Sequence, residues 1–290
     1  MANQLEILKR TELSLVKEFH RLCEQNNLRY VLAFGTMIGA VRHRGFIPWD
    51  DDIDVVMPWD DYCKFAEIAN QQINSDYMLF NEKTVSRYSY PFAKLIKKKS
   101  SAVFEYPFVH YFNQPIYIDI FPAFYTPNDL RQFKTIQFSN FFWGQTGRMK
   151  TSGPFRHTKR GMIAKAGMFA FYCLNKVFSQ EYCYRRMINK ASSVARDGAK
   201  SWYIGDMYSE INAIGQFQMP LDVFDNRILM QFEDTELYMP REYDKILRSM
   251  YGDYMTLPPE EKRKSHGFKY VSDTISYLQY DEAQKTKMKS

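Results

Sequence analysis

Apolar residues near the start of the chain recur at the spacing of a helix. Five of them follow one another every three, four or seven positions and predict an amphipathic helix over residues 4–26: Leu5, Leu8, Leu15, Phe19 and Leu22. Two short apolar runs, Tyr30–Phe34 and Ile53–Met57, predict strands. Between these runs, Gly35–Arg42 predicts a tight turn that leads into a short helix.

The pattern changes beyond the second predicted strand. A helix is expected over residues 60–73, and a short apolar strand over Ile116–Phe121. Residues 128–200 are basic, contain little strand signal and read as helical. Strand signals return over residues 228–239, and a last long helix is expected over 241–251, with a short basic helix after Pro258 and Pro259.

This order of elements predicts an α/β (α+β) protein. We expect a mixed sheet with flanking helices, followed by a helical insertion or C-terminal lobe. The predicted boundary lies near residue 127 and separates a catalytic core, 1–127 with its N-terminal helix, from a part, 128–290, that completes the active site. A chain of 290 residues fits either one large domain or two small ones.

Composition and charge narrow the class of partner. Hydrophobic residues make up 45% of the chain and charged residues 25%, as in soluble globular proteins. The formal net charge of +6 favours anionic partners such as nucleotides, phosphorylated glycans or a membrane surface. The charge is not concentrated enough for a nucleic-acid binder, so no nucleic acid is expected.

The spacing of the cysteines and the hydropathy of the chain indicate where in the cell the protein is expected. The four cysteines have no zinc or redox spacing, so we expect buried free thiols. Met1–Lys9 is too polar for a signal peptide, and no apolar run approaches the ~20 residues of a spanning helix. Ala166–Leu174 is expected to be a core helix, and its basic flank leaves open the alternative that it lies on a membrane surface. The expected location is cytoplasmic, with peripheral contact at the inner face of the membrane.

Four acids lie at the start of the second predicted strand and indicate a site for chemistry: Asp50, Asp51, Asp52 and Asp54. Alternate side chains of a strand share a face, so Asp52 and Asp54 point to one side, ~7 Å apart. Their repulsion is relieved by a divalent cation, and Mg²⁺ (or Mn²⁺) is commonly held by one or two carboxylates and substrate phosphates. The alternative is an exposed turn with a helix cap, but Asp54 lies inside an apolar run where an unpaired charge is costly.

Three further residues fit a phosphate-handling site. Gly35 would let the backbone approach a phosphate, and Thr36 would add a hydroxyl donor. Asp119, from another strand, would complete the metal site or accept a proton from an attacking hydroxyl. The alternative for Asp119 is an ion pair with a nearby lysine.

Three sequence blocks resemble the LicD family of phosphocholine transferases, which have the nucleotidyltransferase fold of DNA polymerase beta-like enzymes. The blocks are GTMIGAVRHRGFIPWDDDIDVVMPWDDY at 35–62, YIDIFP at 117–122 and YGDYMTLPPEEKRKSHG at 251–267. The resemblance implies metal-dependent transfer of phosphocholine, or a similar phospho-substituent, from CDP-choline or a related CDP-linked donor. The implied acceptor is a sugar hydroxyl of a lipid-linked glycan precursor, for teichoic acid or lipopolysaccharide, and CMP would be released.

Within this interpretation, Asp52, Asp54 and Asp119 would hold the metal and perform catalysis. Four residues are candidates for binding the donor phosphates, with Gly35 and Thr36: Arg42, His43, Lys94 and His266. The alternatives are a solvated basic loop for Arg42, a structural hydrogen bond for His43 and a surface histidine for His266. An aromatic cage for choline cannot be assigned among 23 Phe and 21 Tyr, and the oligomeric state stays open.

Two other functions stay open. The first is a nucleotidyltransferase that transfers a nucleotide and releases pyrophosphate. The second is an inactive scaffold that binds nucleotide, although the acids at 52, 54 and 119 argue against it.

Overall fold

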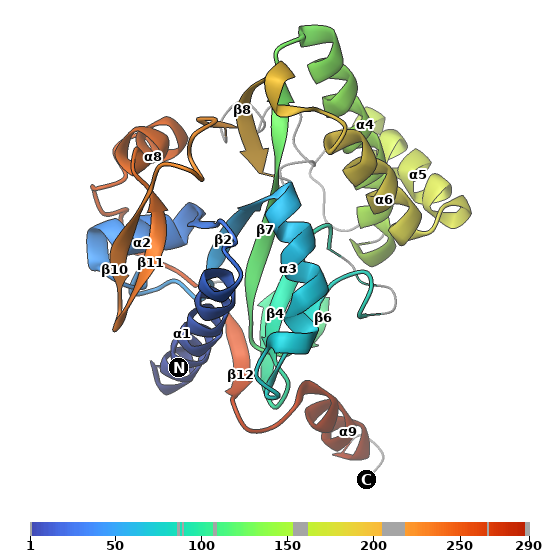
Figure 1. The fold of residues 1–290 in the computed structure, drawn as a ribbon. Coiled ribbons are helices and arrows are strands. Elements are labelled where there is room, and N and C mark those ends of the chain that lie inside the picture. Colours follow the sequence, from blue (N-terminus) through green and yellow to red (C-terminus); the bar gives the residue numbers. More distant parts are fainter. Residues whose placement is uncertain are drawn as a thin grey trace. The chain divides into compact units, whose positions relative to one another are not determined.

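The computed structural model describes residues 2–85, 88, 90–106, 109–152, 162–204, 218–265 and 267–287 (Figure 1). The chain forms two compact units. The first consists of Met1–Phe80, Ala93–Ile120 and Phe224–Ser290, and the second of Asn81–Phe92 and Phe121–Val223. The boundary predicted near residue 127 is close to one crossing between these units, and the chain after Phe224 belongs again to the first.

The first unit combines helices with strands, most of them short. Its helical elements are α1 (Ala2–Gln25), α2 (Phe34–His43), α3 (Trp59–Gln72), α8 (Tyr243–Tyr251), the 3-10 turn η3 (Glu260–Lys262) and α9 (Tyr277–Lys287). Its strands are β1 (Val31–Leu32), β2 (Asp54–Pro58), β3 (Tyr77–Phe80), β4 (Ala93–Lys97), β5 (Ser101–Tyr106), β6 (Val109–Gln114), the first part of β7 (Tyr117–Pro127), β10 (Arg227–Phe232), β11 (Thr235–Pro240) and β12 (Phe268–Ser272).

The strands of the first unit form three sheets. The main sheet has the order β1-β2-β7-β4-β3, a small sheet has the order β12-β5-β6, and β10 and β11 form a hairpin. Strand β2 lies inside the main sheet and all five of its residues are buried, which explains its continuous apolar run. Asp54, its first residue, is therefore drawn into the interior.

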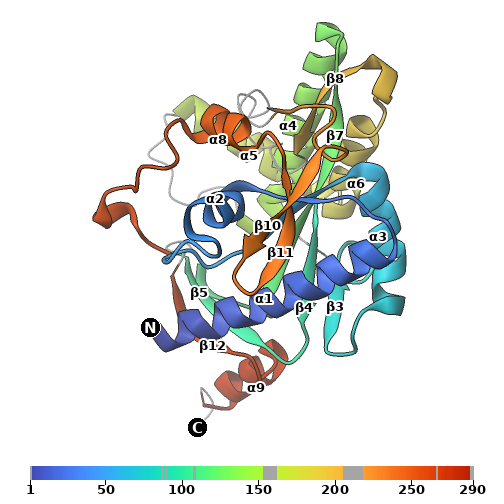
Figure 2. The ribbon, with the colours of Figure 1, turned by 60° about the vertical axis from the view of Figure 1, so that its left-hand side comes forward.

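Helix α1 covers the main sheet with the apolar face that its sequence predicts. Leu8, Leu15, Phe19 and Leu22 are all at most 1% exposed and join one hydrophobic core with residues of the sheet. The helix packs against β4, β12 and α3, and Figure 2 shows it crossing the strands of the sheet. The long helix thus fixes the sheet that carries the acids.

The second unit is largely helical. Its elements are the rest of β7, α4 (Leu130–Ser152), α5 (Met162–Val177), α6 (Gln180–Ala191), the 3-10 turn η1 (Arg196–Gly198), β8 (Ala199–Ile204) and β9 (Gln218–Met219). Strand β8 pairs with β7 and β9, and the rings of Tyr125 and Trp202 stack 3.8 Å apart across the first of these pairs. Helix α4 packs against α5 and α6 (Figure 1).

The predicted mixed α+β class is confirmed, and so are the helices at 4–26 and 60–73. Residues 35–42 differ in one respect, because α2 already begins at Phe34, which has a φ of +46°, and Gly35 lies inside its first turn. Strands β3 to β6 and β8 were not predicted; each has four to six residues, too few to establish a periodicity. The predicted helix after Pro259 is a single 3-10 turn.

The cysteine prediction is partly wrong. All four cysteines are free, but only Cys23 and Cys183 are buried, while Cys63 is half-buried and Cys173, on α5, is exposed. Among the described residues, no helix is long and apolar enough to cross a membrane.

Candidate active site

The acidic motif lies where α2 meets β2, in the first unit. The backbone N–H of Asp54 donates to the hydroxyl oxygen of Thr36 at 2.9 Å, and the Asp54 carbonyl accepts from the N–H of Ala33 at 3.0 Å. Thr36 is 4% exposed. This hydroxyl therefore ties the start of α2 to the start of β2 and fixes the acids relative to the helix.

Asp119 joins the motif from the neighbouring strand. Its backbone N–H donates to the carbonyl of Ile53 at 2.9 Å. Ile53 is the residue between Asp52 and Asp54, so Asp119 lies beside both acids. Burial raises the pKa of Asp54 well above its usual range, and the charges of Asp52 and Asp119 raise it further. The three predicted carboxylates therefore come together and repel one another at the buried Asp54.

Lys94 lies opposite Asp119 on β4 and pairs with it. The Lys94 Nζ atom is 2.6 Å from Asp119 Oδ1 and 3.3 Å from the centre of the Tyr117 ring. The two side chains are 5% and 15% exposed. The structure thus has the lysine pair that was the alternative interpretation of Asp119, inside the cluster of acids.

Gly35 has a contact other than the predicted phosphate. A Cβ atom at this position would lie 2.8 Å from Asp50 Oδ2. The missing side chain therefore makes room for the carboxylate of Asp50 against α2. Whether phosphate also approaches this backbone stays a prediction.

Arg42 and His43 form a hydrogen-bonded pair at the end of α2. Arg42 donates from Nε to His43 Nε2 at 2.9 Å and from Nη1 to the carbonyl of Tyr254 at 2.6 Å. Burial, followed by the charges of Arg42 and Lys9, lowers the pKa of His43. An acceptor Nε2 requires a neutral ring with its proton on Nδ1, so His43 supports Arg42. His266 lies outside the described residues.

Glu12 is a residue near the acids that the sequence analysis did not identify. It is 2% exposed, and its pKa is raised well above the usual range by burial and then by Asp52, Asp51 and Asp50. A signal existed, because position 12 falls between Leu8 and Leu15 in the apolar series of α1, where a charged residue is unexpected. Helix α1 therefore adds a further carboxyl to the acidic region.

Lys9, one turn before Glu12, holds the loop that carries the acids. Its Nζ atom donates to the carbonyls of Ile47 and Pro48 at 2.8 and 3.0 Å. Burial lowers the pKa of Lys9, although the charges of Asp50 and Glu12 oppose this shift. The ammonium group is thus a nearby positive charge that offsets part of the acidic charge.

Tyr251 also reaches the acids, from the end of α8. It is 43% exposed, yet its pKa is raised by burial and then by Asp54, Asp50 and Asp52. The polar end of this side chain therefore lies near the carboxylates while part of the ring faces solvent. Tyr251 is the first residue of the block 251–267, and only the resemblance of that block could have pointed to it.

The block 251–267 makes a second contact with the motif. The Arg263 guanidinium lies 5.4 Å from the centre of the Trp49 ring and donates from Nε to the carbonyl of Pro258 at 2.8 Å. With the bond from Arg42 to Tyr254, this contact brings two sequence blocks about two hundred residues apart together within the first unit.

The negative charge of the acids suits a cation, but few of the carboxylates are available as metal ligands. Among the described residues, no group of three His, Cys, Asp or Glu side chains is arranged to hold a metal ion. Asp119 is engaged by Lys94, which leaves Asp52 and the buried Asp54 as a two-carboxylate set. Such a set suits Mg²⁺, which usually keeps several waters and takes further ligands from substrate phosphates.

Comparison with known proteins identifies the family of this chain. Residues 27–149 match the nucleotidyltransferase domain described as LicD/FKTN/FKRP. The chain is 31% identical over 257 residues to the lipopolysaccharide cholinephosphotransferase LicD of Haemophilus influenzae, which covers 88% of this chain and 92% of that protein. An uncharacterized protein of Rickettsia typhi is 39% identical over 69 residues, 24% of this chain and 22% of that protein. The extent of the first match and the domain it shares show that the chain belongs to the LicD family.

Proposed function

We propose that this protein transfers phosphocholine, or a similar phospho-substituent, from CDP-choline or a related CDP-linked donor to a sugar hydroxyl, and releases CMP. The proposed acceptor is a lipid-linked precursor of a cell-surface glycan such as teichoic acid or lipopolysaccharide. The proposed location is the cytoplasmic face of the membrane. The name of the Haemophilus influenzae relative, together with its 92% coverage, supports this class of reaction.

The observation that carries the proposal is the meeting of Asp52, Asp54 and Asp119 beside a buried strand. Burial and the charges of both neighbours raise the pKa of Asp54, so its ionised form is costly unless a further positive charge lies close to it. A protein gains no stability from such an arrangement. A requirement for a bound cation during function explains why the acids lie there.

The proposed cofactor is Mg²⁺ or Mn²⁺, held by Asp52 and Asp54. When bound, such an ion neutralises charge on the donor phosphates and stabilises the charge that develops during transfer. Asp119 lies beside this pair of carboxylates and is engaged by Lys94. Its pairing with Lys94 at 2.6 Å holds the carboxylate of Asp119 in place, which supports a role next to the reacting groups.

The proposed transfer is an in-line displacement. The acceptor hydroxyl attacks the phosphorus that carries choline, its proton passes to the carboxylate of Asp119, and the bond from that phosphorus to the oxygen of CMP breaks. Lys94 holds Asp119 in orientation through its buried ion pair. Arg42, which already lies against the block 251–267, is the proposed contact for the departing phosphate.

A product assay tests the proposal. The purified protein is incubated with CDP-choline and other CDP-linked compounds, an acceptor glycan and Mg²⁺ or Mn²⁺. We expect CMP in proportion to modified acceptor, and no product when EDTA is present. Release of pyrophosphate from a nucleoside triphosphate would indicate nucleotidyl transfer instead. No turnover with any donor, despite donor binding, would favour the inactive scaffold.

A further inference from the structure

Helix α5 has an apolar sequence but lies largely exposed. Among those of its residues whose burial is described, none is buried. Phe169 is 49% exposed and Val177 76%, while Ala166, Ala170 and Cys173 are also exposed. A helix in the core of a protein buries such side chains. The expectation that Ala166–Leu174 is a core helix is therefore wrong for the residues that the structure describes.

Helix α4, which packs against α5, also has exposed apolar side chains. Its Leu130 and Phe138 are 61% and 67% exposed. Other aromatic residues anchor the helices to one another, because Phe171 of α5 lies 5.8 Å from both Phe141 and Phe142 of α4. Exposed aromatic and aliphatic side chains thus lie on a packed helical frame.

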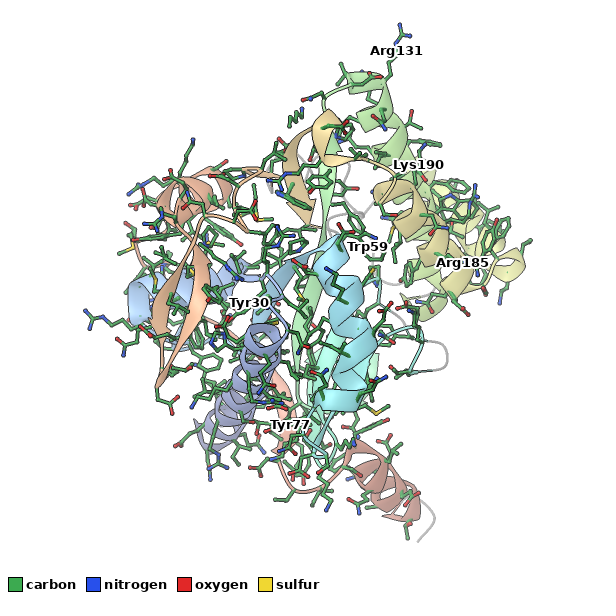
Figure 3. All side chains as sticks on the ribbon, in the orientation of Figure 1. Tyr30, Trp59, Tyr77, Arg131, Arg185 and Lys190 are labelled. Carbon is green, nitrogen blue, oxygen red and sulfur yellow. The ribbon has the colours of Figure 1, made fainter. Side chains whose placement is uncertain are left out.

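The segment that forms these helices is strongly basic. Residues 130–191, here called the helical segment, contain twelve Lys and Arg residues and one acidic residue, Glu181. Their net charge is +11, so the rest of the chain carries −5. Arg131, Arg185 and Lys190 project from α4 and α6 in Figure 3, and the side chains of Lys134, Lys176 and Arg186 are exposed.

We propose that the helical segment docks on the surface of an anionic lipid bilayer, with α5 lying on the bilayer and its apolar side chains entering the interface. An interfacial helix combines exposed Phe and Leu with flanking Lys and Arg. Lipid phosphates complement exposed basic side chains such as those of Lys176 and Arg185, and acyl chains cover the exposed Phe169 and Val177. The described helices are too short or too polar to span a bilayer, which agrees with a helix that lies on the surface.

The positive charge and the exposed apolar side chains of the helical segment disfavour other partners. Two copies that met through this segment would bring two strongly basic stretches of chain together, which costs free energy unless salt screens it. A nucleic acid would satisfy the charge but would leave the aliphatic side chains of Val177 and Leu130 against a polar backbone. An anionic bilayer accommodates both features.

Vesicle binding by the full chain tests the proposal. Vesicles of phosphatidylcholine alone are compared with vesicles of equal parts phosphatidylcholine and phosphatidylglycerol, in flotation assays. We expect binding to the anionic vesicles only, and weaker binding as ionic strength rises. The vesicle assay requires neither donor nor turnover. Absence of vesicle binding would therefore not contradict the proposed transfer reaction, and absence of transfer would not contradict vesicle binding.

Two variants and two matched controls separate the apolar and the ionic contributions. Phe169→Ser combined with Val177→Ser should weaken partition to anionic vesicles by about tenfold or more, since both side chains lose their apolar contact. Lys176→Glu should weaken it by about tenfold. The controls change equally exposed residues of the first unit, Leu229→Ser with Leu278→Ser and, separately, Lys245→Glu, and should bind as the unmodified protein does.

The exposed Cys173 reports on α5 directly. In a Cys63→Ser background, an environment-sensitive dye labels Cys173 because Cys23 and Cys183 are buried. We expect its emission to shift to the blue with anionic vesicles and to stay unchanged with phosphatidylcholine. The same dye on a Lys245→Cys variant that also carries Cys173→Ser should not respond.

Three results would overturn the proposal. The first is absence of binding to anionic vesicles at low salt. The second is binding that the Phe169→Ser and Val177→Ser changes leave intact. The third is a concentration-dependent dimer in sedimentation that these changes abolish, which would identify a second copy as the partner of α5.

Discussion

Glu12 shows how the acidic region affects stability. Burial and the charges of Asp52, Asp51 and Asp50 raise its pKa above the usual 4.5, so the folded protein binds this proton more tightly than the unfolded chain does. As the pH rises above 4.5, the unfolded chain loses this proton first, so the free energy of unfolding falls until the pH passes the raised pKa of Glu12 in the folded protein. The shift of Asp54 has the same sign, whereas that of Lys9 acts only at alkaline pH.

The pH dependence can be measured with Glu12→Gln. In EDTA, the unmodified protein should melt at a lower temperature at about pH 8 than at about pH 5, and the variant should lose part of that difference. Glu6→Gln, an exposed position on the same helix, is the matched control and should follow the unmodified protein. A variant that keeps the full difference would show that Glu12 does not contribute.

Asp54 is expected to be required for turnover but not for folding. Asp54→Asn removes a proposed metal ligand, and loss of about 4 kcal/mol of transition-state stabilisation corresponds to about a thousandfold lower CMP release. Its melting temperature in EDTA should be equal or higher, because the repulsion from Asp52 and Asp119 is relieved. The exposed Asp60→Asn is the control for the same chemical change. Near-normal turnover of Asp54→Asn at saturating Mg²⁺ would refute the assignment.

The ion pair of Lys94 and Asp119 matters for stability mainly because a buried charge is destabilising when its partner is removed. Lys94→Met leaves the carboxylate of Asp119 without this partner and should reduce the free energy of unfolding by about 3 kcal/mol. Adding Asp119→Asn should recover part of that loss. Denaturant titration measures both values. Arg248→Met, which breaks an exposed pair with Asp244, should change stability little, and an equal loss in that variant would contradict the argument.

Helix α2 depends on close contact with the loop that follows it. A Cβ atom on Gly39 would lie 2.4 Å from the backbone oxygen of Gly45, which also lies against Glu233 at the tip of the β10-β11 hairpin. Gly39→Ala should therefore lower the free energy of unfolding by about 2 kcal/mol or more. Gly167→Ala in α5 meets no atom within 4 Å and should raise it by about 0.5–1 kcal/mol. Thermal unfolding of the two variants measures this contrast, and equal stability would contradict it.

Elements with a long local pattern could be predicted from the sequence, and contacts between distant segments could not. The spacing of apolar residues predicts helix α1. The acids at 52 and 54 lie at the start of a buried strand, within one continuous motif. Tyr251 reaches those acids from the far end of the chain, which no local pattern encodes. For α5, the same apolar composition fits a core or an exposed face, because a sequence does not state what covers a helix.

The molecule as a whole keeps the described candidate residues in one unit. Binding of CDP-choline with Mg²⁺ should therefore protect amides from hydrogen exchange in the first unit, above all near Asp54, Asp119 and Tyr251. EDTA should abolish this protection, and a UDP-sugar should not reproduce it. Protection confined to the helical segment would mean that the donor binds away from the acids.

The path of the chain through the two units has a consequence for how such proteins diversify. The chain leaves the first unit after Ile120, directly beyond Asp119, and returns at Phe224. The carboxylates, Lys94 and Tyr251 are all encoded outside this excursion. Residues 121–223 can therefore accumulate substitutions, or be exchanged between relatives as one cassette, without altering the identity of the residues proposed to perform the chemistry.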